Sequence, residues 1–585
     1  MKIFVGIIFS IWCTTAFATD LHITPDSSLT DAVRHARELR RTAKANSITI
    51  HMSPGTYCLY EPLRLRPEDS GLKIIADNGA TISGGMEITG WKEQGKLWVA
   101  DVPNFNGRPI DFRQLWVNGR KAVRARSVAD FEQMERIRTY DKKNQILWIP
   151  KTAVASILKG NKIKTGNDYL EMVLHEMWCV ANLRIKSLTP VGDSVAVRFH
   201  NPESKIQFEH PWPSPMTPNT GHPSPFLLTN SKDLIDEPGE RYHDIRAHKL
   251  YYMPRKGEKK TDQFVVPVLE TIVQFIGSAE HPVRNITIKG VAFEHTTWMR
   301  PSEKGHVPLQ AGMYLTEAYK LRPSIDRPNN HKLDNQGWLG RASAAVTLSH
   351  TENISFNHCR FCHEGGSGLD YKIGCKGGTV TDCTFTDIAM NGIVIGSFSP
   401  EGLETHLPYV PTDFREICRN QTIENSEFYD VTNEDWGCVA IAAGYVSDVC
   451  IEHNTIHDIS YTGISVGWGW NRDLGCMKNN KICANLIYNY AQHMYDCAGI
   501  YTLGNQPGTI ITENVVRDIA NPSYVHDPNH WFYLYTDEGS SNITVCNNWT
   551  PSEKYLQNAN GPGNVWKNNG PQVSEAIKSA AGKYK

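Results

Sequence analysis

Two segments near the end of the chain place carboxylates beside aromatic side chains. One spans residues 493–504 and contains Asp496, and the other spans residues 532–542 and contains Asp537. Hydrolysis of a glycosidic bond uses such a pair, because one carboxyl group protonates the leaving oxygen and the other acts at the anomeric carbon, directly or through water. Aromatic neighbours would raise the pKa of the acid by excluding water. The two aspartates are therefore candidates for a catalytic pair, with β-turn formation as the structural alternative.

Other side chains in the same part of the chain are candidates for a groove that holds a substrate. Flat aromatic rings pack against sugar faces, although most aromatic residues in any protein serve ordinary packing. The predicted substrate-binding residues are Glu538, Tyr495, Tyr501, Tyr535, His457, Trp468, Trp470, Asn471, Asp370 and Glu364. Glu538 is also a possible substitute for either aspartate. Glu434, Asp435 and Trp436 fall in an intervening segment, and His295 and His363 are predicted to be structural.

An internal repeat indicates how these residues are positioned. Its pattern is an apolar residue, two residues, a small or amide residue, one residue and a second apolar residue. The small or amide positions are Cys359, Cys383, Ser426, Asn454, Asn485, Asn514 and Asn548, separated by steps of 24 to 43 residues. The alternation within each copy has period two, which predicts strands, and strands so far apart can stack in parallel but cannot form hairpins. The sequence predicts an all-β chain built as a right-handed parallel β-helix with an internal ladder; an antiparallel sandwich is the alternative.

The rest of the chain divides around this coil. Residues 1–18 have the charge, apolar stretch and small-residue cleavage site of a signal peptide, so we expect an exported protein, periplasmic or secreted. Residues 19–91 are predicted to hold the first coils and an amphipathic capping helix near residues 29–39. Residues 92–275 break the repeat and contain an Asn-Gly hairpin, which predicts an inserted antiparallel β domain. Residues 276–585 form the main coil, and residues 210–225 and 300–340 are predicted to be loops.

Composition limits the range of partners. The net charge of −2 gives no electrostatic footprint for nucleic acid. No segment after the first is apolar for long enough to span a membrane. The pair Cys359-x-x-Cys362 stands alone, so neither a zinc site nor a cofactor is predicted. Most of the cysteines are expected to be small buried apolar residues, and the sequence leaves disulfide pairing and oligomeric state open.

The spacing of the two aspartates sets a geometric condition. Aligning Tyr501 with Tyr535 places Asp537 opposite Leu503, seven positions beyond Asp496. An extended strand would separate these positions by about 23 Å. The carboxylates therefore meet only if residues 493–498 fold back as a turn.

A family resemblance narrows the chemistry. The run Asp496-x-x-Gly-Ile-Tyr-Thr, the later Tyr-x-Asp-Glu-Gly-Ser-Ser-Asn, and the run from Leu115 to Arg126 resemble glycoside hydrolase family 141 over nearly the whole mature chain. The resemblance implies that Asp496 and Asp537 are the catalytic pair, with their acid and base roles open. It also implies α-L-fucosidase or xylanase activity, and the first expectation is an exported α-L-fucosidase acting on pectin side chains.

Three alternatives stay open. One is a xylan-active glycosidase of the same family. Another is a polysaccharide lyase on the same scaffold, for which Arg472 and Lys478 offer a base but no aspartate cluster resembles a calcium site. The third is a glycan binder without activity, because fold alone does not determine function. In every case the expected partner is an oligosaccharide or polysaccharide.

Overall fold

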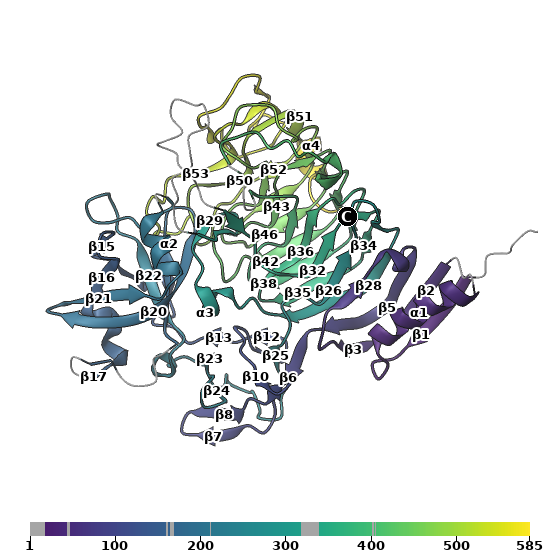
Figure 1. The fold of residues 1–585 in the computed structure, drawn as a ribbon. Coiled ribbons are helices and arrows are strands. Elements are labelled where there is room, and N and C mark those ends of the chain that lie inside the picture. Colours follow the sequence, from purple (N-terminus) through teal and green to yellow (C-terminus); the bar gives the residue numbers. More distant parts are fainter. Residues whose placement is uncertain are drawn as a thin grey trace, which may run out of the picture.

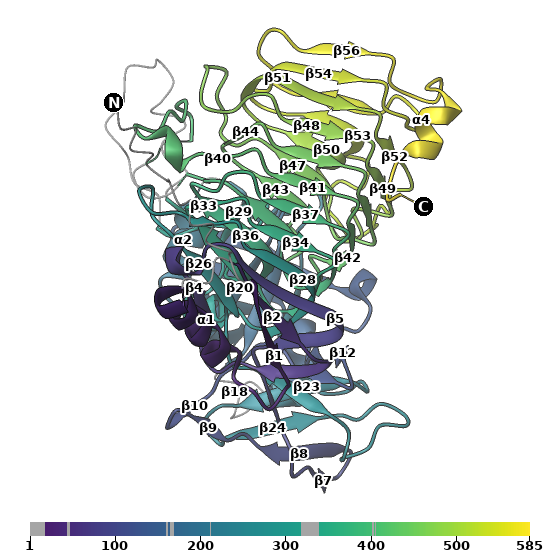
Figure 2. The same ribbon diagram turned by 90° about the vertical axis from the view of Figure 1, so that its right-hand side faces the viewer.

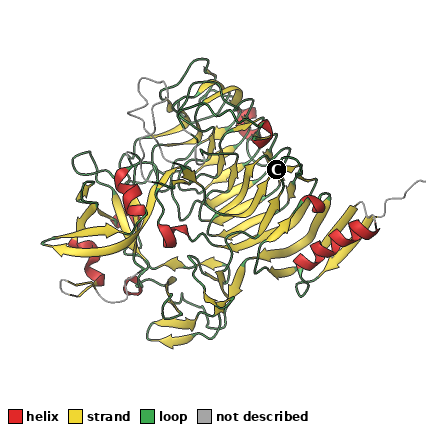
Figure 3. Ribbon diagram, in the orientation of Figure 1, coloured by secondary structure: helices red, strands yellow, loops and turns green. Residues whose placement is uncertain are grey.

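Strands dominate the structure. The computed structural model describes residues 18–43, 47–159, 162–163, 169–210, 212–317, 338–399, 403 and 405–584. The α-helices within these ranges are few and short (Figure 3). They are α1 (Leu29–Ala43), α2 (Glu203–Glu209), α3 (Arg300–Lys304) and α4 (Glu575–Ala580). The predicted signal peptide falls, apart from its last residue, outside the described residues.

A stack of parallel coils forms the body of the molecule (Figure 2). One face is a ten-stranded sheet in which every neighbouring pair is parallel. Its strands, in spatial order, are β4 (Leu63–Leu65), β26 (Val273–Ile276), β32 (Ala344–Ser349), β36 (Ser367–Ile373), β39 (Ile393–Ile395), β43 (Ile441–Ala443), β47 (Ile464–Val466), β50 (Cys497–Thr502), β53 (Trp531–Thr536) and β55 (Tyr555–Gln557). The predicted parallel β-helix is confirmed.

The other faces belong to a nineteen-stranded sheet whose pairings include the parallel steps between successive coils. Its strands in chain order are β1 (Ala18–Ile23), β2 (Ser47–Met52), β3 (Gly55–Cys58), β5 (Leu72–Ser83), β28 (Thr287–Thr296), β34 (Ser355–Asn357), β35 (Arg360–Glu364), β37 (Thr379–Thr381), β38 (Thr384–Ile388), β41 (Thr422–Glu424), β42 (Glu427–Val431), β45 (Cys450–Glu452), β46 (Thr455–His457), β48 (Lys481–Cys483), β49 (Leu486–Tyr488), β51 (Asn505–Thr512), β52 (Val515–Val516), β54 (Ser541–Cys546) and β56 (Val565–Lys567). Two short parallel pairs, β27 (Val283–Arg284) with β33 (Thr351–Glu352) and β40 (Cys418–Arg419) with β44 (Val446–Ser447), complete the coils.

The predicted ladder runs through the interior. The backbone N–H of Asn454 and its side-chain amide each donate to Asn485 Oδ1 at 3.0 Å. The same geometry repeats from Asn485 to Asn514 and from Asn514 to Asn548. Asn548 in turn donates to Asn569, a step that the repeat pattern did not include. Because each amide satisfies buried backbone groups of the preceding coil, the ladder fixes the register of the stack.

The predicted cap and the cysteines also agree with the structure. Helix α1 buries Leu29, Val33 and Ala36 against the first coil, beside β1 and β2 (Figure 1). All thirteen cysteines in the described part of the chain are free thiols. Eleven of these are buried, as expected for small apolar residues stacked in a core.

The inserted region builds separate sheets beside the coil, on the left and lower sides of Figure 1. A seven-stranded antiparallel sheet contains β14 (Glu135–Arg136), β22 (Pro225–Thr229), β19 (Glu171–His175), β20 (Val180–Val191), β21 (Ser194–Phe199), β16 (Ile146–Pro150) and β15 (Thr139–Asp141). A five-stranded sheet contains β13 (Val123–Arg124), β23 (Glu240–Asp244), β24 (Lys249–Tyr252), β8 (Leu97–Asp101) and β7 (Lys92–Gln94), with β13 and β23 parallel.

A four-stranded antiparallel sheet joins these strands to the coil. It contains β12 (Arg120–Lys121), β11 (Trp116–Val117), β25 (Phe264–Pro267) and β6 (Gly85–Glu87), and its hairpin β11–β12 turns at the predicted Asn-Gly. Two further antiparallel pairs are β9 (Asn104–Phe105) with β10 (Arg108–Pro109) and β17 (Leu158–Lys159) with β18 (Lys162–Ile163). The inserted antiparallel β domain is confirmed, and the domain boundaries at residues 91 and 275 stay predictions.

The segment predicted as a loop at 300–340 is partly ordered. It contains α3 and a small antiparallel sheet of β29 (Pro308–Gln310), β30 (Met313–Leu315) and β31 (Leu339–Gly340). Residues 318–337 lie outside the described residues. The loop prediction is therefore wrong for 300–315, where the strands have no hydrophobic alternation long enough to be recognised.

Candidate active site

Two adjacent strands of the ten-stranded sheet position the two aspartates. Strand β50 lies beside β53, and Tyr501 pairs with Tyr535 in the register predicted from the sequence. Asp496 comes immediately before β50 and has a left-handed backbone with φ of 54°. Its N–H donates to the carbonyl of His530 at 2.6 Å, and its carbonyl accepts from the Tyr461 hydroxyl at 2.8 Å. The predicted fold-back of residues 493–498 is only partly present, because Asp496 occupies a bend but Cys497 and Ala498 already belong to the extended strand β50.

Asp496 and Asp537 line one cavity of about 350 Å³. Its wall combines residues in or next to β50 and β53 with residues of neighbouring coils, of β29 and of the inserted domain. The lining residues are Met177, Trp178, Trp212, Gln310, Tyr461, Trp470, Asp496, Tyr501, Tyr535, Asp537, Glu538 and Asn558. The Tyr535 hydroxyl lies close to both carboxylates, and burial together with the negative charges of Asp496 and Asp537 raises the pKa of Tyr535.

Asp537 sits in a network of neutral donors. The Tyr501 hydroxyl donates to Asp537 Oδ2 at 2.5 Å, and Asn558 Nδ2 donates to Oδ1 at 2.7 Å. Gln310 Nε2 donates to the Tyr501 hydroxyl at 2.9 Å, which fixes the direction of that hydroxyl. Burial and the negative charge of Asp496 outweigh these bonds and raise the pKa of Asp537 to about 6. A carboxyl group with this pKa holds its proton in mildly acidic solution and can give it to a leaving group.

The loop after β53 depends on a glycine. Gly539 has φ of 77°, and a Cβ there would lie 2.5 Å from the backbone of Asn471. The backbone N–H of Asp537 donates to the carbonyl of Thr502 at 3.0 Å. The close packing of this loop on the Asn471 segment holds Asp537 at the rim of the cavity.

Asp496 has a different environment. His530 Nε2 lies 3.1 Å from Asp496 Oδ1, and the hydrogen bond with Asp496 raises the pKa of His530. Asp496 thus faces the imidazole of His530, which stays positively charged to a higher pH than an ordinary histidine. The side chains that donate hydrogen bonds to Asp537 are neutral. Environments that separate two carboxyl groups in this way suit one acid and one base.

Comparisons with known proteins identify the family of the chain. A solved structure described as "Glycoside hydrolase" shares 57% sequence identity with the chain, covers 97% of this chain and 99% of its own, and superposes with a TM-score of 0.94. Residues 95–255 match the family model described as the GH141 insertion domain. The chain belongs to glycoside hydrolase family 141.

Two other comparisons add nothing to that assignment. A crystal structure of a hyperthermoactive exopolygalacturonase from Thermotoga maritima covers 94% of this chain and 91% of its own, but at 9% identity and a TM-score of 0.29 it carries no argument. No curated protein matches the sequence. Among the described residues of this family 141 member, no helix is both long and apolar enough to cross a membrane.

The predicted substrate-binding residues separate into three groups. Glu538, Tyr501, Tyr535 and Trp470 line the cavity with the two aspartates. Tyr495, Trp468 and Asn471 lie behind its wall. His457, Asp370 and Glu364 lie on other parts of the coil and are not among the residues that line this cavity.

The residues behind the wall support it. The Trp468 indole donates to Ser399 Oγ at 3.1 Å and packs edge-on against Trp470. Asn471 Oδ1 accepts from the backbone of Asp473, which shapes the loop that contacts Gly539. Tyr495 is buried and packs against His526. Each belongs to the packing of the site rather than to its surface.

The distant residues have other partners. His457 is stacked between Tyr429 and Tyr488, with ring centroids 5.4 and 4.8 Å away, on the nineteen-stranded sheet. Asp370 forms an ion pair with Arg341 at 2.5 Å. Glu364 is fully buried. His457 and Glu364 lie on the nineteen-stranded sheet and so leave the coil at another face. Asp370 lies on the same ten-stranded sheet as the catalytic strands, in register with Tyr501 but on the earlier strand β36, too far along the stack to line this cavity.

Several cavity residues were not predicted. Met177, Trp178 and Trp212 come from the inserted domain, and Trp212 packs edge-on against Trp470 at 6.0 Å. Trp212 lies in the proline-rich segment 210–225, which the sequence predicts to be a loop, and the only local signal for a binding role there is the aromatic side chain itself. Gln310 comes from β29, and Asn558 follows β55. Neither belongs to the repeat pattern, so no local feature marked them.

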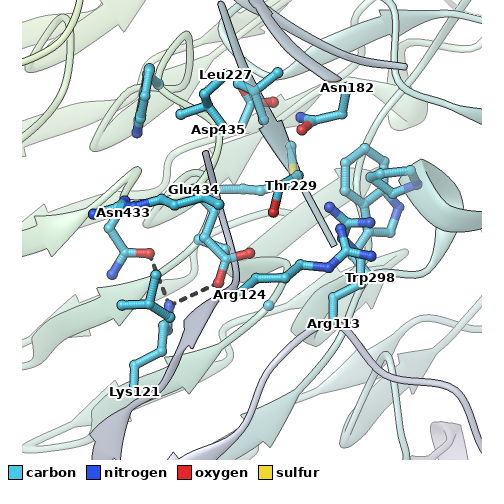
Figure 4. Close-up of a pocket in the computed structure, with 18 of the residues that line it drawn as sticks. Arg113, Lys121, Arg124, Asn182, Leu227, Thr229, Trp298, Asn433, Glu434 and Asp435 are labelled. Carbon is cyan, nitrogen blue, oxygen red and sulfur yellow. Dashed lines mark hydrogen bonds and ion pairs between the residues drawn. The ribbon is translucent and has the colours of Figure 1, made fainter. Parts of the chain in front are cut away.

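A second cavity, of about 230 Å³, lies between the inserted domain and the coil (Figure 4). Glu434, Asp435 and Trp436 line it, together with cations of the inserted domain. Lys121 Nζ lies 3.3 Å from Glu434 Oε1, an ion pair that Figure 4 marks with a dashed line, and His306 Nε2 lies 2.8 Å from Asp435 Oδ2. Glu434 thus already has a partner across the interface between the inserted domain and the coil, and Asp435 has one in the segment before β29.

Proposed function

We propose that the chain is an exported α-L-fucosidase that removes L-fucosyl units from pectin side chains. Asp537 is the general acid, and Asp496 is the carboxylate that acts at the anomeric carbon. The observation that carries this proposal is the shared cavity in which the pKa of Asp537 is raised to about 6 while Asp496 faces His530. Membership of family 141 supports the reaction class.

The two aspartates and their hydrogen-bonding neighbours have separate roles in hydrolysis. Asp537 gives its proton to the glycosidic oxygen as the bond to the anomeric carbon breaks. Tyr501 and Asn558 then donate hydrogen bonds to the Asp537 carboxylate, and these bonds stabilise its negative charge in the cavity. Asp496, held by His530 and Tyr535, either attacks the anomeric carbon or activates a water molecule that does so.

The volume and the lining of the cavity favour a single sugar unit as the group that is released. Its volume of about 350 Å³ lies near the lower end of the range of roughly 300–1,000 Å³ for ligand pockets. Trp178, Trp212 and Trp470 give it apolar rings, against which the C6 methyl group of a 6-deoxy sugar would pack. The choice of L-fucose over another 6-deoxy sugar rests on the family resemblance.

The test is a substrate panel with identification of the released sugar. The purified protein is incubated with aryl α-L-fucoside, aryl β-xyloside, fucosylated pectic oligosaccharides and xylan. We expect free L-fucose from the first and third substrates and no xylose. Release of xylose without fucose would transfer the proposal to the xylan-active alternative, and an unsaturated, ultraviolet-absorbing product would indicate a lyase. N-terminal sequencing of the exported protein should begin at Thr19.

A further inference from the structure

Three side chains with metal-ligand atoms meet where the inserted domain contacts the early coils. Glu294 on β28 pairs directly with Cys362 on β35, and Cys362 Sγ lies 3.2 Å from Glu294 Oε1. His363 follows Cys362 with a left-handed φ of 58°, so its ring does not take the opposite face as the next residue of a regular strand would. One ligand atom from each of Glu294, Cys362 and His363 lies within 4.8 Å of the other two.

This spacing suits a single small cation. Zinc binds thiolate sulfur at about 2.3 Å, imidazole nitrogen at about 2.0 Å and carboxylate oxygen at about 2.0–2.2 Å, which places tetrahedral ligand atoms roughly 3 to 4 Å apart. The preceding residues Phe293 and Phe361 stack in the core with ring centroids 5.0 Å apart. The two strands that carry the ligand atoms are therefore already fixed side by side.

A carboxylate orients the imidazole. His363 Nδ1 lies 2.7 Å from Asp387 Oδ2 on the next coil, which leaves Nε2 as the nitrogen available for a cation. Asp387 is itself held by the Trp116 indole at 2.7 Å and by Lys121 at 2.9 Å, both from the hairpin of the inserted domain. A ligating histidine whose other nitrogen donates to a carboxylate is the usual outer arrangement of protein zinc sites.

A second carboxylate stands next to this group without a partner. Glu364 follows His363, its side chain has no exposed surface, and neither of its oxygens has a hydrogen bond within the part of the chain that the structure describes. A buried carboxyl group in this condition is costly unless it gains a proton or a cation nearby. Glu294 and His363 are half-buried, so the group as a whole can be reached from solvent.

We propose that Glu294, Cys362 and His363 bind a zinc ion, with Asp387 as the positioning residue for His363. The donor set of one sulfur, one nitrogen and one oxygen suits zinc and disfavours calcium and magnesium, which take oxygen ligands. Binding displaces the proton of the Cys362 thiol into solvent and forms the sulfur–zinc bond, while no electron is transferred. Water takes the fourth position.

The zinc site would link the early coils to the inserted domain. Its ligands join the strands β28 and β35, and Asp387 connects the same histidine to Trp116 and Lys121 of the inserted domain. Because the metal binds the folded arrangement and not the unfolded chain, it stabilises the native state.

Metal binding and thermal melting test the proposal without reference to hydrolysis. The full chain is reduced, freed of metal by chelation and titrated with zinc, calcium and magnesium. We expect one equivalent of zinc to bind and to raise the melting temperature, with no effect of the other two ions. Cobalt(II) at the same site should show a sulfur-to-cobalt charge-transfer absorption that Cys362→Ser removes.

Matched variants separate this site from adventitious thiols. Cys362→Ser and His363→Ala should lose at least about 100-fold in zinc affinity, and Asp387→Asn about 10- to 100-fold. Cys483→Ser is the control, because Cys483 also lies beside a glutamate, Glu513 at 3.7 Å, but is absent from the group of ligand atoms that includes a histidine. Absence of zinc binding to the wild type, or equal binding by wild type and Cys362→Ser, would overturn the proposal.

Discussion

At the scale of single residues, the chemistry depends on the different surroundings that the cavity gives to two aspartate carboxyl groups. Asp537 is held by a tyrosine and an asparagine, and Asp496 by a histidine and a tyrosine. Desolvation is the largest influence on Asp537, and the repulsion from Asp496 adds to it. Asp537 is thereby prepared to carry a proton in mildly acidic solution.

The pH dependence of hydrolysis follows from this difference. The general acid must be protonated in the free enzyme, and the pKa of Asp537 is about 6. We therefore expect kcat/KM to fall tenfold per pH unit once the pH exceeds about 6. Steady-state rates with an aryl fucoside across the acidic and neutral range measure this limb. A constant kcat/KM up to pH 8 would show that Asp537 is not the acid.

The substitution Tyr501→Phe tests the network around the acid. The Tyr501 hydroxyl stabilises the charged form of Asp537, so its removal should raise the pKa of Asp537. The alkaline limb of the pH–rate profile should move to higher pH. Asn558→Ala removes the other neutral donor and should move the limb in the same direction.

A control for this shift is Trp566→Phe, which changes an aromatic residue in the last coil away from the cavity. Its profile should match the wild type. A limb that moves to lower pH in Tyr501→Phe would contradict the assigned direction.

At the scale of elements, the amide ladder sets the height of each coil and so the position of the catalytic strands. Replacing Asn485 with Ala leaves the backbone N–H and the side-chain amide of Asn454 without their buried acceptor. Each unsatisfied buried group costs about 1–3 kcal/mol, so for the two groups we expect a loss of roughly 2–6 kcal/mol in the free energy of unfolding. Urea denaturation of the wild type and variant measures it.

The comparison variant for the ladder is Asn568→Gly. Asn568 also bonds to the asparagine of a neighbouring coil, Asn547, but it is exposed and has a left-handed backbone that glycine accepts. This substitution should change the free energy of unfolding by no more than about 0.5 kcal/mol. Similar losses in both variants would mean that burial of the ladder is not what stabilises the coil.

The ladder and the strand register were predictable from the sequence, because each copy of the repeat carries its own signal. The stack of Phe361, Phe385 and Phe428, with centroids 4.6 Å apart at each step, follows the same pattern. The bend at Asp496 was recognised as a condition but could not be predicted, since it depends on Tyr461 and His530 from other coils. Gln310 was missed because its strand is only three residues long.

At the scale of the whole molecule, the inserted domain completes the cavity that the coil begins. Met177, Trp178 and Trp212 face Trp470 and the aspartates across the gap between the two parts. Such a contact between segments more than 250 residues apart depends on how two folded units dock. The sequence predicted both units but had no local pattern that could show this docking.

The substitution Trp212→Ala tests the role of the inserted domain in binding. It removes an apolar ring from the cavity without touching Asp496 or Asp537, so it should raise KM about tenfold and change kcat less. Trp566→Ala, a half-buried tryptophan in the last coil, is the matched control and should change neither constant. A drop in kcat with unchanged KM would indicate that Trp212 acts on the reacting groups instead.

The central claim is that Asp496 and Asp537 together perform the hydrolysis, and single substitutions to Asn test it most directly. Each should lower kcat by about 10²- to 10⁴-fold, because a positioned acid or base contributes that much. The folded-state pKa of Asp537 is raised, so the stability linked to its protonation is present below its ordinary pKa and lost as the pH rises through about 6. Asp537→Asn should therefore melt no lower than the wild type at neutral pH. Full activity in either variant, or inactivity that comes with unfolding, would contradict the claim.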